Sequence, residues 1–368
     1  MHWHIILTER CNLKCKYCYE KSMNEFENGL ESKWEYDNDT PCDSEVSIEK
    51  IKGFLAKDSE PTLIFYGGEP LVKMERMMKI MDEVDSRFCI QTNGILLNKI
   101  PEEYLMKFSK ILVSIDGDRR VTEYNRGEGR YDQIITNVKG IREKGFSGEV
   151  VARMTISREF PDVINQVKHL LGLGIFDSVH FQIDAGFYKS DFNEKEFGVF
   201  VKDYNYSISK LVDWWLFEMR GGKVWKIYPF FGIWDSLVNG CSGKLPCGSG
   251  HSNYTITTSG ELSACPIMNS IKDFYCGDLD SEISDIKKIE CDSCKECDYY
   301  SICGGRCLYS NLAGLWPKVG MDMICETIKF LVDKIKSSLE EIDVLIDRGV
   351  ISKKDFEFEK YFGSEIIP

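Results

Sequence analysis

The chain has 368 residues, 43% of them apolar and 12% aromatic, so it has enough apolar sequence for about two domains with buried cores. Its 59 acidic and 46 basic residues give a net charge of −13, which argues against a broad basic surface for nucleic acid. The sequence shows neither a signal-peptide pattern at its start nor an apolar run long enough to span a membrane, so a soluble, cytoplasmic protein is expected.

The cysteines are grouped rather than scattered. Of the 15 cysteines, three lie between residues 11 and 18, and most of the others lie between residues 241 and 325. Disulfide scaffolds are typical of short secreted chains, whereas closely spaced cysteines in a long intracellular chain indicate metal ligands. The grouping therefore predicts two metal-binding regions.

Short apolar segments alternate with segments of helical spacing over the first half of the chain. Strands are predicted at residues 5–7, 61–66, 88–92, 111–115, 149–156 and 178–183. Helices are predicted at residues 48–55, 74–84, 101–108, 131–144 and 163–171, with Ser47 as the N-cap of the first. This alternation is typical of parallel strands joined by helical crossovers and predicts an α/β fold, a partial (β/α)6 TIM-like barrel. In such folds the active site forms at the carboxyl ends of the strands.

The chain is expected to divide into successive segments. The barrel takes residues 1–195, an aromatic-rich bridging helical region takes 196–240, and a cysteine-rich domain takes 241–330. The last segment, residues 331–368, holds the end of an amphipathic helix predicted over residues 326–351 and a charged tail.

The first cysteine group is a C-x3-C-x2-C array of Cys11, Cys15 and Cys18, directly after the first strand. Three thiolates are one short of the four ligands that a structural zinc or an ordinary four-cysteine iron–sulfur cluster requires. A cluster held by three cysteines keeps one iron open for a small-molecule ligand. A zinc loop with a distant fourth ligand, or reactive thiols without metal, are the alternatives.

Polar residues follow the other predicted strands. Gly67-Gly68-Glu69-Pro70 follows the second strand, where glycines let the backbone approach a ligand and a Glu accepts from an amine. Asn93, Ser114 and Asp116 follow the next two strands, and Arg126, expected in a glycine-rich loop, can bind a carboxylate at two points. A simple turn, a helix cap and a solvated arginine are the alternatives. Together these groups describe a pocket for a small zwitterion.

The second cysteine region combines two patterns with a hairpin. The patterns are Cys241-x5-Cys247-x12-Gly260-x4-Cys265, then Cys294-x2-Cys297-x5-Cys303-x3-Cys307, and finally Cys325. Residues 255–264 predict a hairpin with a Ser-Gly turn. The thiols suffice for two four-thiolate sites, and zinc and iron–sulfur clusters both accept such ligands.

The C-x3-C-x2-C array, with Tyr17 before its last cysteine, resembles the signature of the radical S-adenosylmethionine (SAM) superfamily. The resemblance extends over roughly residues 3–185 and includes Gly67–Pro70, Thr92–Gly94 and Ser114–Gly117. It implies a [4Fe–4S] cluster on the three cysteines, SAM bound at the open iron, and cleavage of SAM to a 5′-deoxyadenosyl radical that abstracts a substrate hydrogen.

The same resemblance implies contacts to SAM from several of these strand-end residues. Gly67, Gly68 and Glu69 would hold the methionine amine, and Tyr17 would lie near the adenine. The full set of expected cofactor-binding residues is Tyr17, Gly67, Gly68, Glu69, Pro70, Asn93, Ser114, Asp116 and Arg126, of which Ser114, Asp116 and Arg126 are candidates for the ribose and carboxylate.

The second cysteine region resembles the SPASM extension of peptide-modifying members of the superfamily. The resemblance implies a first auxiliary [4Fe–4S] cluster on Cys241, Cys247, Cys265 and Cys307, and a second on Cys294, Cys297, Cys303 and Cys325. Together with the SAM-binding cluster this makes three. Cys276 and Cys291 are left over, as spare thiols or alternative ligands.

The resemblance implies modification of a side chain in a ribosomal peptide or protein, by a crosslink such as a thioether or a carbon–carbon bond, or by oxidation. A ferredoxin- or flavodoxin-type reductant is expected. Pro266 stands where sulfatase-maturing members have an Asp, which argues against that oxidation. Few residues precede Cys11, so leader recognition is expected to be internal, supplied by a separate protein, or unnecessary. Asp184, at a strand end, is the candidate catalytic residue.

Two other functions are the alternatives. One is a radical SAM enzyme that acts on a small metabolite or on RNA, with the net charge arguing against RNA. The other is a non-enzymatic iron–sulfur or zinc-binding module, for which an open-iron cysteine loop beside a glycine-rich pocket would have no use.

Overall fold

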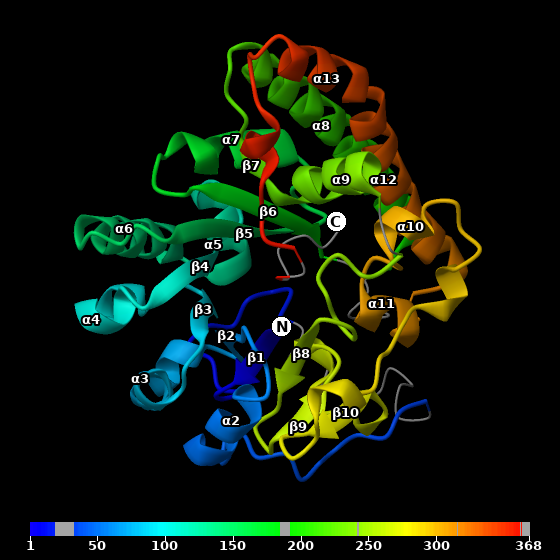
Figure 1. Cartoon of the computed structure of the whole chain (residues 1–368). Helices are drawn as coiled ribbons and strands as arrows, with labels where there is room; N and C mark the ends of the chain where they lie inside the picture. The colour runs from blue at the N-terminus through cyan, green and yellow to red at the C-terminus, as the bar shows by residue number, and fades with distance from the viewer. Residues whose placement is uncertain (19–32, 185–191, 241–242, 315, 361, 363–368) are drawn as a thin grey trace. The chain divides into compact units, whose positions relative to one another are not determined.

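The computed structural model describes residues 1–18, 33–184, 192–240, 243–314, 316–360 and 362 (Figure 1). The chain divides into two compact units. The first unit is Met1–Arg153 with Gly248–Glu290, and the second is Met154–Cys247 with Cys291–Pro368. Residues of the cysteine-rich segment therefore contribute to both units.

The first unit is built on a sheet of parallel strands. These strands are β1 (His2–Ile6), β2 (Thr62–Tyr66), β3 (Arg87–Thr92), β4 (Phe108–Ser114) and β5 (Glu149–Ile156), each paired with the next. The connecting helices are α2 (Ile48–Leu55), α3 (Met74–Glu83), α4 (Glu102–Leu105), α5 (Arg119–Arg126) and α6 (Arg130–Glu143). Ile5, Phe65 and Ile90 are fully buried, as expected for a parallel sheet that is covered on both faces.

A hairpin from the cysteine-rich segment joins the other edge of β1. Its strand β8 (Asn253–Ile256) runs parallel to β1, and β9 (Glu261–Ser263) pairs antiparallel with β8 and with β10 (Tyr275–Asp278). His4 Nδ1 lies 2.7 Å from Asn253 Oδ1, and the ring of Trp3 stacks on that of Tyr254 with centroids 5.9 Å apart. The predicted hairpin is confirmed, and it completes the sheet of the first unit.

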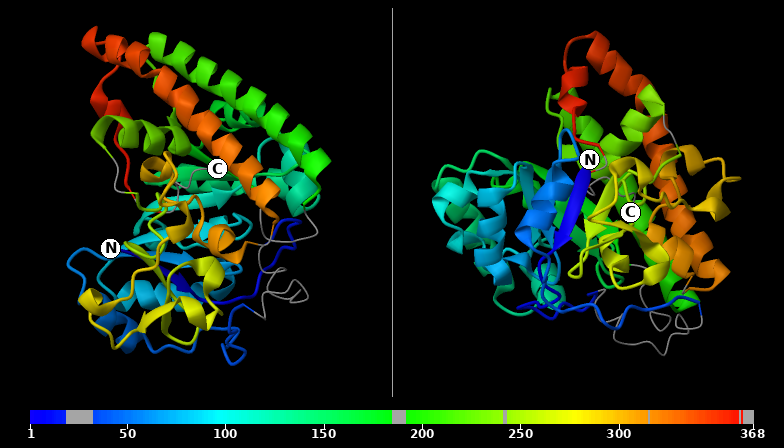
Figure 2. Two further views of the ribbon diagram at one scale, coloured as in Figure 1. Left: turned by 90° about the vertical axis from the view of Figure 1, so that its right-hand side faces the viewer. Right: turned by 60° about the horizontal axis from the view of Figure 1, so that its bottom comes forward.

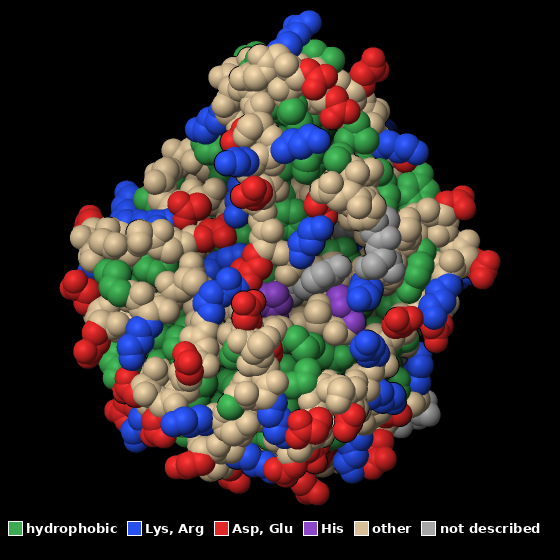
Figure 3. Space-filling model, viewed as in Figure 1, with side chains coloured by type: hydrophobic (Ala, Val, Ile, Leu, Met, Phe, Trp, Pro, Cys, Tyr) green, Lys and Arg blue, Asp and Glu red, His purple; other side chains and the backbone are tan. Residues whose placement is uncertain are grey.

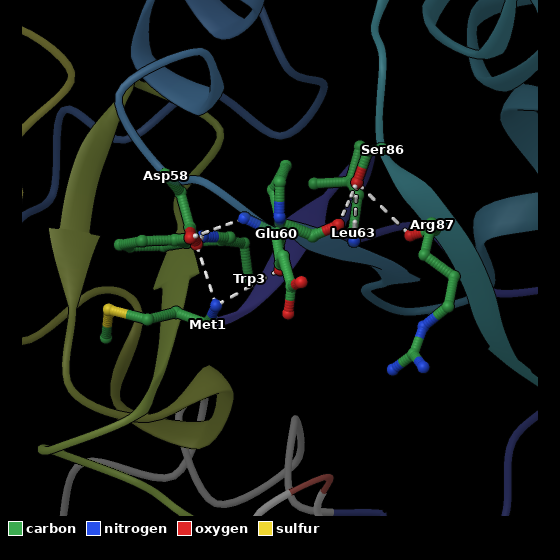
Figure 4. A network of polar contacts seen from close by, with 8 residues as sticks. Met1, Trp3, Asp58, Glu60, Leu63, Ser86 and Arg87 are labelled. Carbon is green, nitrogen blue, oxygen red and sulfur yellow. Dashed lines mark hydrogen bonds and ion pairs between the residues drawn. The ribbon is translucent and has the colours of Figure 1, made fainter.

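The start of β1 is tied to the loop after α2 (Figure 4). The amino group of Met1 and the indole N–H of Trp3 both donate to Asp58 Oδ2 over 2.8 Å. The Ser86 hydroxyl accepts from the backbone N–H of Leu63 over 3.1 Å and donates to the carbonyl of Pro61 over 2.9 Å. These contacts fix the amino ends of β1 and β2. The cysteine loop and the glycine segment follow the carboxyl ends of the same two strands.

The second unit is mainly helical. It contains β6 (Ser178–Ile183), parallel to β7 (Lys226–Ile227), and the helices α7 (Val163–Gly172), α8 (Glu194–Arg220), α9 (Tyr228–Asn239), α10 (Tyr300–Cys303), α11 (Leu308–Ala313), α12 (Lys318–Ser337) and α13 (Leu339–Asp347). Helices α8 and α12 run side by side (Figure 2). Trp215 packs against Phe230, Phe231 and Phe356 in an aromatic core, so the aromatic residues of α8 and α9 serve packing.

Several predicted elements are confirmed to the residue, namely α2 with its Ser47 cap, β5 and β6. Others differ. Helix α4 ends at Leu105 because β4 already begins at Phe108. The helix predicted over residues 326–351 begins at Lys318 and is divided at Ser338, whose hydroxyl donates to the carbonyl of Lys334.

Helix α5 is missing from the sequence prediction. The placement of Arg126 in a glycine-rich loop was wrong, since Arg126 is the last residue of this helix. The helix begins after Asp118, whose side chain accepts from the backbone N–H of Val121 over 3.0 Å. Its sequence is almost entirely polar, so it lacks the apolar periodicity by which the other helices are predicted.

Acidic and basic side chains are interspersed on the face of the molecule that Figure 3 shows. No helix in the described ranges has the length and apolar character needed to cross a membrane.

Candidate active site

The three-cysteine loop follows β1 directly. Cys11 is exposed, and Cys15 and Cys18 are half-buried. The backbone N–H of Leu13 points at Cys11 Sγ over 3.5 Å, and the N–H of Lys16 donates to the carbonyl of Asn125 over 2.9 Å. The loop is thus anchored to the end of α5.

The two glycines after β2 are required by the chain's own backbone. The N–H groups of Gly68 and Glu69 donate to the carbonyls of Thr8 and Arg10, each over 2.9 Å. Gly67 has a φ of 132°, and a Cβ on Gly67 or Gly68 would collide with backbone oxygens of residues 8–10. The glycines therefore let this segment pack closely against the residues just before Cys11. The sequence analysis expected them to let the backbone approach a ligand, and their contact with SAM stays a prediction.

Glu69 connects the ends of β2 and β3. Its Oε1 accepts from the Leu71 N–H over 3.0 Å and from the Thr92 hydroxyl over 2.8 Å, and its Oε2 accepts from the Asn93 N–H over 2.8 Å. Burial raises its pKa to about 7, and these donors oppose the shift. Pro70 follows as the first residue of a short 3-10 helix, Pro70–Lys73. Contact between Glu69 and the SAM amine stays a prediction.

Asn93 lies against the cysteine loop. Its side-chain amide donates to Asn12 Oδ1 over 2.7 Å and points at Cys11 Sγ over 3.8 Å, while its Oδ1 accepts from the Ile95 N–H over 3.0 Å. Asn12 was missed in the sequence, although it stands inside the cysteine array. The end of β3 and the first cysteine are therefore connected through two asparagines.

Tyr17, Asp116 and Arg126 form a triad of which Asp116 and Arg126 are buried and Tyr17 is half-buried. Arg126 binds Asp116 through Nε–Oδ2 and Nη2–Oδ1 distances of 2.9 Å, and the Tyr17 hydroxyl donates to the same carboxylate over 2.7 Å. The Asp116 and Arg126 side chains are 0% and 6% exposed. Burial and the neighbouring carboxylate raise the pKa of Tyr17, against the opposing charge of Arg126.

This triad changes the interpretation of its members. They were expected to meet the adenine, ribose and carboxylate of SAM, but their polar groups are joined to one another. Ser114 lies half-buried at the end of β4. Contacts of these four residues to SAM stay predictions, whereas the anchoring of the cysteine loop by the triad is a feature of the structure.

A second cysteine site lies within the second unit. A partly open cavity is lined by Cys294, Cys297, Cys303 and Cys325, the four thiols expected for the second auxiliary cluster. All four are free thiols, and burial raises the pKa of Cys303 to about 12. In the part of the chain that the structure describes, no group of three His, Cys, Asp or Glu side chains could hold a single metal ion.

Two polar residues beside this cavity were missed in the sequence. The Asn311 amide donates to Cys294 Sγ over 3.0 Å. Arg306 lines the same cavity with a buried guanidinium. Arg306 lies within the Cys303-x3-Cys307 pattern and Asn311 follows it, but nothing in the spacing marks either residue.

The expected ligands of the first auxiliary cluster are divided between the units. Cys265 belongs to the first unit, Cys247 and Cys307 belong to the second, and Cys241 lies outside the described residues. Asp184 directly follows β6 in the second unit, and its N–H donates to the carbonyl of Ile156 over 2.9 Å. Its catalytic role stays a prediction.

The two leftover cysteines differ from each other. Cys291 is buried against Gly305, and its pKa is raised by burial and by the neighbouring thiols of Cys307, Cys294, Cys247 and Cys303. Cys276, in the first unit, donates its S–H to the carbonyl of Phe274 over 3.4 Å. The structure therefore brings Cys291, but not Cys276, among expected ligands of its own unit.

The residues present fit the groups that the resemblance implies. Soft thiolate ligands suit iron–sulfur clusters, and amide N–H groups directed at sulfur are typical of cluster surroundings. Leu13 and Asn93 supply such groups at the first site, and Asn311 does so at the second. The three-thiol loop would hold a SAM-binding cluster, and the four-thiol cavity would hold an auxiliary one.

Comparisons with known proteins agree with this interpretation. Residues 5–171 match the radical SAM superfamily. The radical SAM cyclopropyl synthase TigE of Paramaledivibacter caminithermalis is 22% identical over 369 aligned residues, which cover 90% of this chain and 74% of TigE.

Two solved structures share the fold over most of the chain. The structure of anSMEcpe with bound AdoMet has a TM-score of 0.68 at 16% identity and covers 96% of this chain and 97% of its own. Streptococcus suis SuiB bound to the precursor peptide SuiA has a TM-score of 0.55 at 14% identity and covers 87% of this chain and 75% of its own. The predicted α/β fold with a TIM-like barrel is thereby confirmed. Residues 5–171 thus carry a radical SAM domain, and the chain over most of its length is similar to the SPASM-type peptide-modifying enzymes.

Proposed function

We propose that this enzyme modifies a side chain of a ribosomal peptide or protein, forming a crosslink such as a thioether or carbon–carbon bond, or oxidising the side chain. The observation that carries the proposal is the four-thiol cavity of the second unit, present in addition to the three-thiol loop. The known relatives support a peptide substrate, since SuiB is solved with the precursor peptide SuiA and anSMEcpe with the Cp18Cys peptide.

The chain's own residues would act in binding and positioning. Cys11, Cys15 and Cys18 would hold the SAM-binding cluster, and the Tyr17–Asp116–Arg126 triad would keep their loop in place. When bound, a [4Fe–4S] cluster with SAM supplies the one-electron chemistry that creates a hydrogen-abstracting radical. Glu69 and Asn93 would keep the ends of β2 and β3 fixed beside that loop, so that SAM meets a preformed surface.

A crosslink or oxidation removes two hydrogens from the substrate, and the second electron must leave. The cysteines of the second region would hold two auxiliary clusters that take this electron. A ferredoxin- or flavodoxin-type protein would supply the electron for SAM cleavage. Leader recognition would be internal, supplied by a separate protein, or unnecessary.

Anaerobic reconstitution followed by metal analysis tests the cluster assignment. We expect about twelve irons per chain, as three four-iron clusters require, and no zinc. With SAM and dithionite, the protein is expected to form 5′-deoxyadenosine, and a Cys15→Ala variant to form none. About four irons would remove the auxiliary clusters from the proposal, and absence of 5′-deoxyadenosine from a protein with its iron in place would refute radical chemistry.

Peptides encoded near the gene are the substrates to try first. Mass spectrometry should detect a product that has lost two hydrogen atoms, only when SAM and the reductant are both present. Formation of 5′-deoxyadenosine stimulated by a small metabolite, with every peptide left unchanged, would refute the peptide assignment and keep the radical chemistry.

A further inference from the structure

Arg306 is a buried cation on the wall of the four-thiol cavity. Its side chain lines the cavity beside Cys294, Cys297, Cys303 and Cys325, and the residue is only 7% exposed. An arginine is almost never buried without a partner, because removing a guanidinium from water is costly. The groups around the guanidinium of Arg306 must therefore compensate its positive charge.

The contacts of Arg306 are neutral and few. Its Nη1 donates to the Ser310 hydroxyl over 3.2 Å, and its Nη2 points at the carbonyl of Ile183 over 3.4 Å. Its Nε has no hydrogen-bond partner in the described parts of the chain, and no described carboxylate pairs with it. Among the described residues that line the cavity there is no Asp or Glu. A buried guanidinium with this environment calls for a negative charge in the cavity itself.

The backbone at Arg306 is unusual as well. With a φ of 66°, it is the one residue other than glycine at positive φ in the described ranges. A left-handed conformation is unfavourable for a long side chain, and such strain is typical of functional positions. Gly304 and Gly305 precede it, also at positive φ, and Cys307 follows. In the sequence this turn places Arg306 between Cys303 and Cys307, at a positive φ that glycine adopts more easily.

We propose that Arg306 is a positioning residue for the second auxiliary cluster, whose negative charge it compensates and whose reduction potential it raises. This inference rests on the proposed function, which places that cluster on the four thiols. A [4Fe–4S] cluster with four thiolates is negatively charged and becomes more so on taking up one electron. A buried positive charge beside it favours the reduced form, since net charge, hydrogen bonds and solvent exposure set such potentials.

The test compares Arg306→Met with Arg306→Lys and with Lys329→Met. Lys329 lines the same cavity but is exposed, so solvent screens its charge and it serves as the matched control. All three changes are made in the reconstituted full chain carrying Cys11→Ala, Cys15→Ala and Cys18→Ala, which removes the SAM-binding cluster. Iron is counted, and the two remaining clusters are titrated with dithionite under EPR detection.

We expect Arg306→Met to retain its iron and to lower the reduction potential of one of the two clusters. The equilibrium constant for reduction of that cluster should decrease at least tenfold, which is about 59 mV for one electron. Arg306→Lys should recover part of the shift, and Lys329→Met should change the constant less than threefold. If Arg306→Met lost four irons and Arg306→Lys kept them, the need for charge would likewise support the proposal.

Unchanged potentials in an Arg306→Met protein with full iron would overturn the inference and leave the proposed function intact. Loss of the same four irons in Arg306→Lys as in Arg306→Met would also overturn it, in favour of a role in shape alone. Absence of auxiliary iron from the parent protein would instead refute the cluster assignment.

Discussion

Arg126 and Asp116 form a buried, two-point ion pair in which both nitrogen–oxygen distances are 2.9 Å. The pair is closed by Tyr17, a residue of the cysteine loop, so the loop is held by an electrostatic contact nearly a hundred positions away in the sequence. A buried pair of this kind is costly to break on one side, because the remaining charge has no partner.

Replacing one member of the triad should therefore destabilise the protein strongly. Arg126→Met leaves the Asp116 carboxylate buried without its cation, and we expect the free energy of unfolding to fall by about 3–5 kcal/mol. Tyr17→Phe removes one hydrogen bond to a charged group and should cost about 1.5–3 kcal/mol. Denaturant unfolding of the anaerobic protein measures both changes.

The exposed ion pair between Arg220 and Glu341 provides the control for these variants. Arg220→Met should leave the unfolding midpoint almost unchanged, because solvent screens that pair. An Arg126→Met protein as stable as Arg220→Met would contradict the anchoring role of the triad.

Gly68→Ala should damage the three-cysteine loop without unfolding the protein. An added Cβ would collide with the backbone oxygens of Glu9 and Arg10, so the segment leading to Cys11 must shift. We expect the reconstituted variant to lose about four irons of the expected twelve and to form no 5′-deoxyadenosine. Gly140→Ala is the control, since open space surrounds that helical position, and the change should be neutral or stabilise by about 0.5–1 kcal/mol. Full iron in Gly68→Ala would show that the loop tolerates the shift.

The two unassigned cysteines should behave differently on substitution. Cys291 is buried among the thiols of its unit, so Cys291→Ala is expected to lower the iron content after reconstitution. Cys276 is engaged with the carbonyl of Phe274, so Cys276→Ala is expected to retain all the iron. Equal iron in both variants would identify Cys291 as a spare thiol, and iron loss in Cys276→Ala would overturn the distinction.

Histidine burial between β1 and β8 should make the protein sensitive to acid. Burial lowers the pKa of His4 from 6.5 to about 3, while its hydrogen bond with Asn253 opposes the shift. Below pH 6.5 His4 binds a proton in the unfolded chain but stays neutral in the folded one. The free energy of unfolding that His4 contributes above this pH is therefore lost as the pH falls. Between pH 8 and 5.5 the contribution of His4 is about 1.4 kcal/mol.

The comparison of wild type with His4→Gln isolates this contribution. The loss of unfolding free energy over that pH interval should be smaller in the variant by the stated amount, in urea titrations at each pH. The same pH dependence in both proteins would mean that His4 is not the group responsible. His2, whose pKa burial also lowers to about 3, should account for further loss in both.

Sequence reasoning predicted the elements whose signals are local. The helix Ile48–Leu55 has an apolar face and a serine cap, and the strand Ser178–Ile183 alternates polar and apolar residues, so both were placed to the residue. The cysteine spacings were as informative, since thiols at such intervals have few other uses. Helix α5 gave no signal, because its buried face includes Asn125 and Arg126 in place of apolar residues.

The partners of the site residues could not be predicted in the same way. Whether Asp116 meets a ligand or Arg126 depends on the helix between them, and whether Gly68 meets SAM or Arg10 depends on how closely two segments pack. The sequence identifies the chemical groups, but tertiary packing decides which of these groups contact one another. Arg306 is the extreme case, since its importance comes entirely from burial.

The parallel pairing of β8 with β1 has a consequence for anyone who wishes to divide this protein. From the sequence, a chain cut near residue 240 would look like an isolated catalytic barrel. Such a chain would lose β8, which pairs with one edge of β1. The unpaired backbone edge of β1, a strand that includes the apolar residues Trp3 and Ile5, could then pair with other molecules. Exposed strand edges of this kind cause aggregation. Grafting or exchanging the cysteine-rich segment therefore requires that its hairpin be kept with the barrel.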